Sequence, residues 1–281
     1  MLGRAVGTGK AEVGLRRRFQ LAWVRLMLTM RMAGKRALVT GAASGIGKAV
    51  VSSFLQEGAE VIAADIEYSA TASPTRQNSI EVHLDVARES DWELLLERAG
   101  RLDALVACAG ISDVRSIAET SLADWHRVMA VNLDGAFLSL RYGARAMREN
   151  GGGTIVLVGS ASGVKPVPQA SAYCASKAAV RMLAKAAALE LRSEGIRVNC
   201  ISPAGVVTPM WRKMPFWRDL IQQHGSEEGA WNSLGSADPN KPSIQRMAFP
   251  EEIADAVVFL SCDQSAHITG VDLAVDAGYA A

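Results

Sequence analysis

Short apolar runs alternate with longer segments of helical pattern along the chain from Lys35 onward. The runs are rich in valine, isoleucine, leucine and alanine, with little polar alternation, which is typical of strands covered on both faces. They predict strands at Arg36–Thr40, Glu60–Ala64, Ile80–Leu84, Ala104–Ala107, Thr154–Val158, Arg197–Ile201 and Asp272–Val275.

Helical patterns fill the gaps between these runs. The predicted helices are Ile46–Gln56, Ser90–Ala99, Leu122–Asn150, Ala172–Glu194 and Glu251–Cys262. Regular alternation of this kind indicates right-handed strand–helix–strand units and a parallel sheet. Neither an internal repeat nor a low-complexity linker interrupts it. The sequence therefore predicts an α/β fold: a single doubly wound Rossmann-type domain, with about seven parallel strands and helices on both faces.

The first 32 residues differ in kind, with seven basic residues and one acid. A basic, acid-poor leader is typical of an organellar transit peptide. A translation start assigned too far upstream explains the basic segment as well, because Met30 and Met32 directly precede the first predicted strand. We prefer this interpretation. Arg25 interrupts the apolar stretch 19–32, which is too short and too charged to span a bilayer. We expect the catalytic domain to occupy residues 33–281.

An irregular segment between the last two strands, residues 208–247, is rich in aromatic side chains. A long insertion of this kind is more often a functional lid than a linker. Five large apolar residues fall within eight positions: Met210, Trp211, Met214, Phe216 and Trp217. We expect two or three of them to pack the lid on the domain and the others to face a substrate pocket or a neighbouring subunit. This composition favours a cyclic or otherwise bulky hydrophobic substrate.

Composition excludes several other classes of function. The 281 residues are 49% hydrophobic and carry a net charge of +1 without a long basic block, which gives no footprint for nucleic acid. The four cysteines and four histidines are dispersed, without the spacing of a metal site or a disulfide framework. We expect a cytoplasmic enzyme with a small-molecule substrate, without a metal and not bound to a membrane.

A glycine-rich turn, TGAASGIG from Thr40 to Gly47, joins the first predicted strand to the first helix. Glycines let the backbone turn tightly and approach a pyrophosphate, whose charge the helix N-terminus stabilises. A lone glycine pattern is equally explained by a structural turn, but here a strand precedes it and a helix follows. The predicted cofactor contacts in this turn are Gly41, Ser44, Gly45, Ile46 and Gly47.

Asp65 ends the second apolar run, eighteen residues after Gly47. An acid in this place can accept hydrogen bonds from the adenosine ribose hydroxyls, although Asp also ends strands as an ordinary turn residue. The next arginine is Arg76, too far along the chain to suggest a site for a 2′-phosphate. This pattern favours NAD over NADP.

Tyr173 and Lys177 stand four residues apart in a strongly helical segment, so both side chains lie on one face. A free phenol has a pKa near 10, and a nearby ammonium together with a positively charged nicotinamide ring would lower that value. Alone, the pair would be an ordinary helix contact.

Together these motifs resemble the short-chain dehydrogenase/reductase family. Its pattern is a Thr-Gly-x-x-x-Gly-x-Gly turn, a mid-chain Asn, a Ser about thirteen residues before a Tyr, and Tyr-x-x-x-Lys. The matching residues are Thr40 to Gly47, Asn132, Ser160, Tyr173 and Lys177. The four motifs occur in the family's order, and the resemblance covers about residues 33–281.

The resemblance implies a role for each matching residue. Tyr173 would be the general acid/base on the substrate oxygen, and Ser160 would hydrogen-bond that oxygen; Ser162 lacks the family's spacing. Lys177 would bind the nicotinamide ribose, and Asn132 would anchor a water in a proton relay. The other implied cofactor contacts are Asp85, Val86, Ala109, Gly110, Pro203, Val206 and Thr208.

The implied reaction is hydride transfer between NAD(H) and the carbinol carbon of a secondary alcohol or ketone, in a homotetramer. Two departures are present: Cys108 stands where the family has a second Asn, and Ala204 is interposed before Gly205. An NADPH-dependent carbonyl reductase is the alternative among enzymes, although Asp65 opposes it. The other alternative is a non-catalytic NAD-binding protein, which would not need the whole set of catalytic-type residues.

Overall fold

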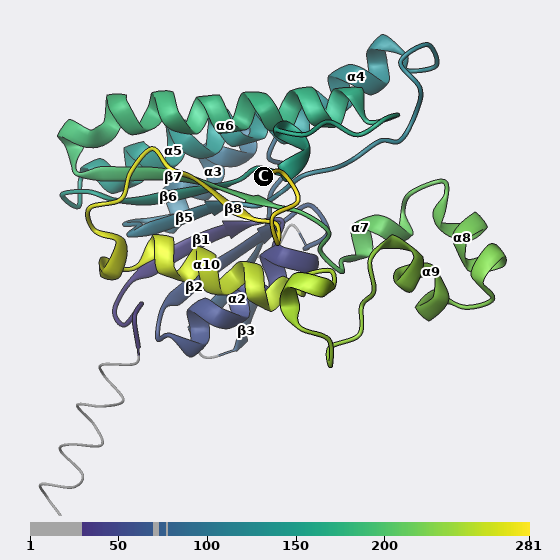
Figure 1. Ribbon diagram of the computed structural model, residues 1–281. Helices are drawn as coiled ribbons and strands as arrows, with labels where there is room; N and C mark the ends of the chain where they lie inside the picture. The colour runs from purple at the N-terminus through teal and green to yellow at the C-terminus, as the bar shows by residue number, and fades with distance from the viewer. Residues whose placement is uncertain (1–29, 70–72, 77) are drawn as a thin grey trace, which may run out of the picture.

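A twisted sheet with helices on both faces forms the body of the molecule in the computed structural model, which describes residues 30–69, 73–76 and 78–281 (Figure 1). Within these residues the sheet has eight strands in the order β3-β4-β2-β1-β5-β6-β7-β8. The strands are β1 Arg36–Thr40, β2 Glu60–Asp65, β3 Ser73–Arg76, β4 Ser79–His83, β5 Ala104–Ala107, β6 Gly153–Val158, β7 Ile196–Pro203 and β8 Asp272–Val275. The seven predicted strands are confirmed, and all pair in parallel.

The eighth strand, β3, was not expected. It pairs antiparallel with β4 at the edge of the sheet, with Ser73 opposite Glu81. Its four residues, SPTR, include a proline, which cannot donate to a ladder and is therefore confined to edge strands or bulges. No apolar run marks so short and polar a strand in the sequence.

Helices α2 (Gly45–Gln56) and α10 (Pro250–Ser261) cover one face of the sheet (Figure 1). The opposite face carries α3 (Glu89–Ala99), α5 (Gly135–Arg148) and α6 (Ser171–Leu191). Neighbouring side chains of β1 belong to different cores: Leu38 packs toward α5 and α6, whereas Val39 packs toward α2 and α10. Burial on both sides explains the absence of polar alternation in the strands.

The long helix predicted over Leu122–Asn150 is interrupted. It consists of α4 (Leu122–Met129), a π-helical turn (Ala130–Asp134) and α5. The turn contains Asn132, whose side chain binds the backbone of Ile111 instead of solvent. Hydrogen bonds from the side chain to another segment fix the widened turn, and apolar periodicity alone does not reveal such turns. The helix predicted over Ala172–Glu194 ends at Leu191, followed by a 3-10 turn over Arg192–Glu194.

Arg31 and Met32, two residues that precede the boundary expected at Ala33, contact the domain. Met32 is fully buried in the core beneath α2, and its backbone N–H donates to the carbonyl oxygen of Glu57 at 3.0 Å. Arg31 forms an ion pair with the Glu57 carboxylate, with its backbone N–H donating at 2.8 Å. Residues 1–29 lie outside the described residues.

The segment predicted to be a lid contains α7 (Pro209–Arg212), α8 (Trp217–His224) and α9 (Glu227–Leu234), which project together from one end of the sheet (Figure 1). A parallel bridge between Val206 and Ala248 joins the two ends of the segment. No helix among the described residues is both long and apolar enough to cross a membrane.

Candidate active site

A cleft of about 1280 Å³ runs along the carboxyl ends of the parallel strands, between the sheet and the lid segment. In doubly wound folds, ligands bind at this edge, where the strand order reverses. Here the order reverses between β1 and β5, and the loops after both strands line the cleft.

All of the predicted site residues except Asn132 line this cleft. From the cofactor set these are Gly41, Ser44, Gly45, Ile46, Gly47, Asp65, Asp85, Val86, Ala109, Gly110, Pro203, Val206 and Thr208. Ser160, Tyr173 and Lys177 line it as well. Residues separated by up to 167 positions in the chain are therefore brought together, since Gly41 and Thr208 share one cavity.

The glycine-rich turn folds so tightly that side chains at Gly41 and Gly47 would clash with neighbouring backbone atoms. A Cβ on Gly47 would lie 2.1 Å from the carbonyl oxygen of Gly41, and one on Gly41 would lie 2.8 Å from the Cα of Ala109. Gly41 and Gly45 have positive φ angles of 67° and 53°. Ser44, the N-cap of α2, makes no side-chain capping bond, which leaves the first turn of the helix open to an anion. These features fit a pyrophosphate.

Asp65 has the turn role considered for it and also faces the cleft. Its carboxylate accepts hydrogen bonds from the backbone N–H of Ala43 at 2.9 Å and of Glu67 at 3.0 Å, so it stabilises both neighbouring turns. The residue also lines the cleft. A carboxylate has about four acceptor positions, so lone pairs remain for ribose hydroxyls.

Ser160 lies directly after β6 and caps a short 3-10 turn, Ala161–Gly163. Its Oγ accepts a hydrogen bond from the backbone N–H of Ser162 at 3.1 Å. Since this bond uses a lone pair of the oxygen, the hydroxyl hydrogen remains free to donate. The side chain of Ser160 lies close enough to Tyr173 to lower the pKa of its phenol.

Burial raises the pKa of Tyr173 above its ordinary value, and the side chain of Ser160 acts in the opposite direction. The ammonium of Lys177 lies 5.8 Å from the centre of the tyrosine ring. The protein's own groups do not lower the tyrosine pKa on balance, because burial of the phenol outweighs them. The phenol is therefore protonated at neutral pH. The lowering expected from Lys177 together with the nicotinamide ring stays a prediction for the protein with its cofactor bound.

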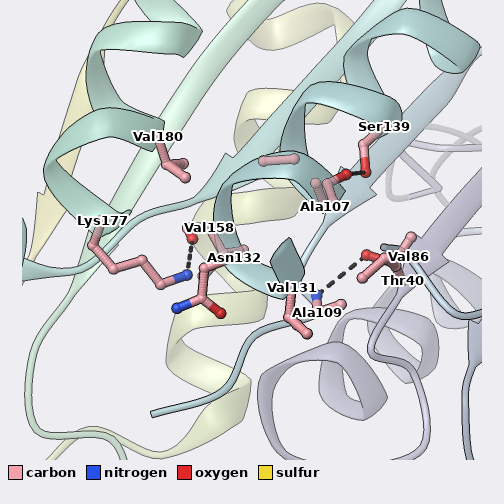
Figure 2. A pocket seen from close by; sticks show the side chains of 12 residues that line it. Thr40, Val86, Ala107, Ala109, Val131, Asn132, Ser139, Val158, Lys177 and Val180 are labelled. Atoms are coloured by element: carbon pink, nitrogen blue, oxygen red, sulfur yellow. Dashed lines mark hydrogen bonds between the residues drawn. The ribbon is translucent and has the colours of Figure 1, made fainter. Parts of the chain in front are cut away.

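Lys177 is 4% exposed, and its Nζ donates to the backbone carbonyl oxygen of Val158 at 2.8 Å (Figure 2). Burial lowers the pKa of this ammonium. Lys177 follows Tyr173 by one turn of α6, as the spacing predicted, so both line the same wall of the cleft. An ammonium has three donors, which leaves hydrogens for a ligand hydroxyl.

Asn132 lies behind this wall, where it lines a separate cavity of about 10 Å³ beside Lys177 (Figure 2). Its Oδ1 accepts from the N–H of Ile111 at 2.8 Å, and its Nδ2 donates to the carbonyl oxygen of Ile111 at 2.9 Å and to Ser176 Oγ at 3.0 Å. Both amide hydrogens are thus used within the protein. A cavity of this size has room for about one water molecule.

Cys108, where the family has asparagine, lines the cleft. Burial raises the pKa of its thiol to about 12, which makes it a neutral side chain rather than a reactive thiolate. Its backbone N–H and that of Ala109 both donate to Thr40 Oγ1, at 3.1 and 3.2 Å. The turn is therefore retained although the asparagine side chain is missing.

The lid segment supplies the apolar side of the cleft through Met210, Trp211, Met214 and Phe216. Trp217 instead packs on Trp231 within the lid, with ring centroids 4.6 Å apart, and only 4% of it is exposed. The Nε1–H of Trp211 donates to the carbonyl oxygen of Val206 at 2.8 Å, which fixes this ring at the base of the lid.

Sequence reasoning missed two further groups of cleft residues. They are Ile111, Ser112 and Val114 after β5, and Asp276, Ala277, Gly278 and Tyr279 after β8. Both follow the carboxyl ends of parallel strands, which was the signal available. No group of three or more His, Cys, Asp or Glu side chains in the described part of the chain is arranged to hold a metal ion.

Comparisons with known proteins agree with this geometry. The family model described as enoyl-(acyl carrier protein) reductase matches residues 41–280. The chain is 37% identical over 255 residues to a 3-alpha-(or 20-beta)-hydroxysteroid dehydrogenase of Mycobacterium tuberculosis, covering 88% of this chain and 90% of the relative. The chain belongs to the short-chain dehydrogenase/reductase family. It is therefore an oxidoreductase with the family's nicotinamide dinucleotide fold, as the motifs predicted.

Two other similarities show the breadth of the family around this chain. A D-threitol dehydrogenase of Mycolicibacterium smegmatis is 36% identical over 260 residues, covering 89% of this chain and 94% of the relative. The crystal structure of a 3-ketoacyl-(acyl-carrier-protein) reductase from Brucella melitensis complexed with NADH has a TM-score of 0.76 and 29% identity. This similarity covers 89% of this chain and 100% of that one.

Proposed function

We propose that the protein is an NAD-dependent dehydrogenase that oxidises a bulky hydrophobic secondary alcohol, or reduces the corresponding ketone. The observation that carries this proposal is the position of Ser160, Tyr173 and Lys177 on one wall of a cleft whose lid side is lined by Met210, Trp211, Met214 and Phe216.

The residues of the cleft fit a nicotinamide dinucleotide. The open N-terminus of α2 and the tight turn that Gly41 and Gly47 permit suit the pyrophosphate, while Asp65 suits the adenosine ribose. A nicotinamide dinucleotide held by these residues would supply the acceptor for the hydride, and with it two electrons, of the carbinol carbon. Lys177 has donors left for the second ribose after its bond to Val158.

The proton of the substrate hydroxyl goes to Tyr173. Ser160 keeps its hydroxyl hydrogen available and donates it to the substrate oxygen, which stabilises the charge that develops there. Because burial keeps the phenol protonated, additional positive charge near its oxygen is needed before it can accept a proton. Lys177 and the cavity it shares with Asn132 form the exit path by which Tyr173 exchanges its proton with water.

The choice of NAD rests on Asp65. A 2′-phosphate at the ribose would meet this carboxylate, whereas hydroxyls can donate to it. The neighbouring Glu67, which also lines the cleft, adds to the negative charge.

The choice of a hydrophobic substrate rests on the lid. Its four apolar side chains can bury several methylene groups, each contributing roughly 0.8 kcal/mol. Relatives named for hydroxysteroids fit this class, whereas the relative named for D-threitol is the polar alternative.

The test is turnover of a panel of secondary alcohols with NAD, followed by absorbance of the reduced cofactor. The panel contains a hydroxysteroid, a substituted cyclohexanol, D-threitol and 3-hydroxybutyrate. The proposal expects the highest kcat/KM with the ring alcohols. A higher value with D-threitol or 3-hydroxybutyrate contradicts the substrate class, and no turnover of any member contradicts the enzymatic function.

We also propose that the protein is a cytoplasmic homotetramer. Leu122 on α4, Phe137 on α5, and Met182 and Leu189 on α6 are exposed apolar side chains on the helices through which tetramers of this family commonly pair. Exposed apolar surface of this kind is typical of subunit interfaces. Analytical ultracentrifugation of the full chain tests the assembly.

A further inference from the structure

Arg181 continues the row of Tyr173 and Lys177 on α6, one turn further from the helix N-terminus. It does not line the cleft as the other two do. Its Nη1 donates to the backbone carbonyl oxygen of Gly163 at 3.0 Å, and its Nε forms an ion pair with Asp272 on β8. Gly163 ends the 3-10 turn that Ser160 caps, so Arg181 binds that turn from the side of α6.

Asp272 connects Arg181 to the residue that precedes Ser160. Its second carboxylate oxygen accepts from Ser202 Oγ at 2.6 Å. Ser202 lies against Gly159, since a Cβ on that glycine would be 2.9 Å from Ser202 Oγ. Gly159, directly before Ser160, and Gly163, three residues after it, therefore both touch one connected group: Arg181, Asp272 and Ser202.

Close packing leaves the turn little freedom. A Cβ on Gly163 would lie 2.8 Å from the backbone of both Lys177 and Ala178, so the turn touches the backbone of α6. The charged groups are mostly screened from water: the side chains of Arg181 and Asp272 are 24% and 10% exposed. Hydrogen bonds between ionised partners in such surroundings are stronger than exposed ones.

We propose that Arg181, Asp272 and Ser202 are positioning residues that hold residues 159–164, the Ser160 turn, against Tyr173. None of the three lines the cleft within the described part of the chain. They act on the reaction through Ser160, whose hydroxyl must meet both the phenol and the substrate oxygen. The effect on turnover rests on the proposed function, whereas the effect on the turn does not.

Two variants and one control test this proposal. Arg181→Met removes both bonds, and Asp272→Asn removes the charge while keeping the shape, in case the first variant folds poorly. Arg148→Met is the control, because Arg148 forms a bidentate ion pair with Glu194 at 2.7 Å, at the opposite end of α6 from Tyr173. Each variant is compared with the full-length wild-type protein.

The first measurement is hydrogen–deuterium exchange, without substrate or cofactor. The amides of Gly163 and Val164 donate to Ser160 and Ala161 within the turn, both at 2.9 Å. They should exchange at least about tenfold faster in Arg181→Met or Asp272→Asn, as expected when local opening becomes easier. Unchanged exchange in both variants overturns the proposal. If the wild-type protein shows no turnover, the exchange measurement alone tests the proposal.

The second measurement is steady-state kinetics. kcat should fall about tenfold or more, while KM and the Kd for NAD change less than about threefold, because misplacement of a reacting group affects the chemical step most. Arg148→Met should leave all three nearly unchanged. A fall in kcat of less than about threefold, or an equal fall in Arg148→Met, contradicts a positioning role.

Discussion

The ammonium of Lys177 donates a hydrogen bond to the carbonyl oxygen of Val158, 2.8 Å away, and so joins the middle of the active-site wall on α6 to the end of β6. Val158 stands two residues before Ser160. The bond therefore connects Lys177, which follows Tyr173 on α6, to the strand end that leads to the serine. Burial of the phenol and the side chain of Ser160 have the largest effects on the pKa of Tyr173.

The first prediction is a pH dependence that Ser160 controls. Alcohol oxidation needs the phenolate of Tyr173 to accept a proton, so kcat for oxidation should rise with pH through the tyrosine pKa. The proximity of Ser160 lowers this pKa, so Ser160→Ala should move the midpoint to higher pH as well as lower kcat. A shift of one pH unit corresponds to about 1.4 kcal/mol. A midpoint that moves to lower pH contradicts the assignment.

Ser162 supplies the matched control for this experiment. It lies in the same turn and lines the cleft, but its contact with Ser160 is through its backbone N–H, which Ser162→Ala retains. The midpoint of the Ser162→Ala profile should therefore stay at the wild-type value.

The second prediction concerns the cofactor. A 2′-phosphate beside the Asp65 carboxylate would be repelled by roughly 3–4 kcal/mol at an effective dielectric near 20. This corresponds to a preference for NAD of about two orders of magnitude or more in kcat/KM. Asp65→Asn should reduce the preference, whereas Glu67→Gln should reduce it less. Comparable efficiency with NADP in the wild type contradicts the proposed cofactor.

The third prediction separates the two kinds of aromatic residue in the lid. Phe216 lines the cleft, so Phe216→Ala should raise KM for a ring alcohol and change the melting temperature little. Trp217 is buried against Trp231, so Trp217→Ala should cost about 3–5 kcal/mol if the lid unfolds together with the domain. Melting curves and kcat/KM for both variants provide the test, and an unchanged KM in Phe216→Ala contradicts its contact with substrate.

The fourth prediction concerns the start of the domain. A chain beginning at Met30 keeps the buried Met32 and the Arg31–Glu57 ion pair, whereas one beginning at Ala33 loses both. Loss of a buried methionine side chain costs about 2–5 kcal/mol. The chain from Ala33 should therefore melt several degrees below the chain from Met30. Equal melting temperatures would show that these residues do not stabilise the domain.

The fold was largely predictable because strands that are buried on both faces are apolar at nearly every position. Leu38 and Val39 are both apolar although they face opposite cores, and the other parallel strands repeat this pattern. The failures have local causes. The edge strand Ser73–Arg76 is short and contains no apolar run, and the π-helical turn depends on a bond between Asn132 and Ile111, which are distant in sequence.

The candidate site was predictable where a motif fixes a residue type and not where only position matters. Tyr173 and Lys177 could be identified by spacing, and the carboxyl end of β2 marked Asp65. Tyr279 carries no motif, and it lines the cleft only because β8 ends at the same edge of the sheet. The direction of the tyrosine pKa shift depends on how deeply the phenol is buried, which the sequence could not give.

The most direct test of the central claim is the kinetics of Tyr173→Phe, which removes one hydroxyl and keeps the ring. With NAD and the best ring alcohol of the panel, kcat should fall at least about 100-fold, the contribution expected of a general acid/base. The Kd for NAD, measured by titration calorimetry, should stay within about threefold of the wild-type value. Turnover within about tenfold of the wild type, with NAD still bound, would contradict the role of Tyr173 in proton transfer.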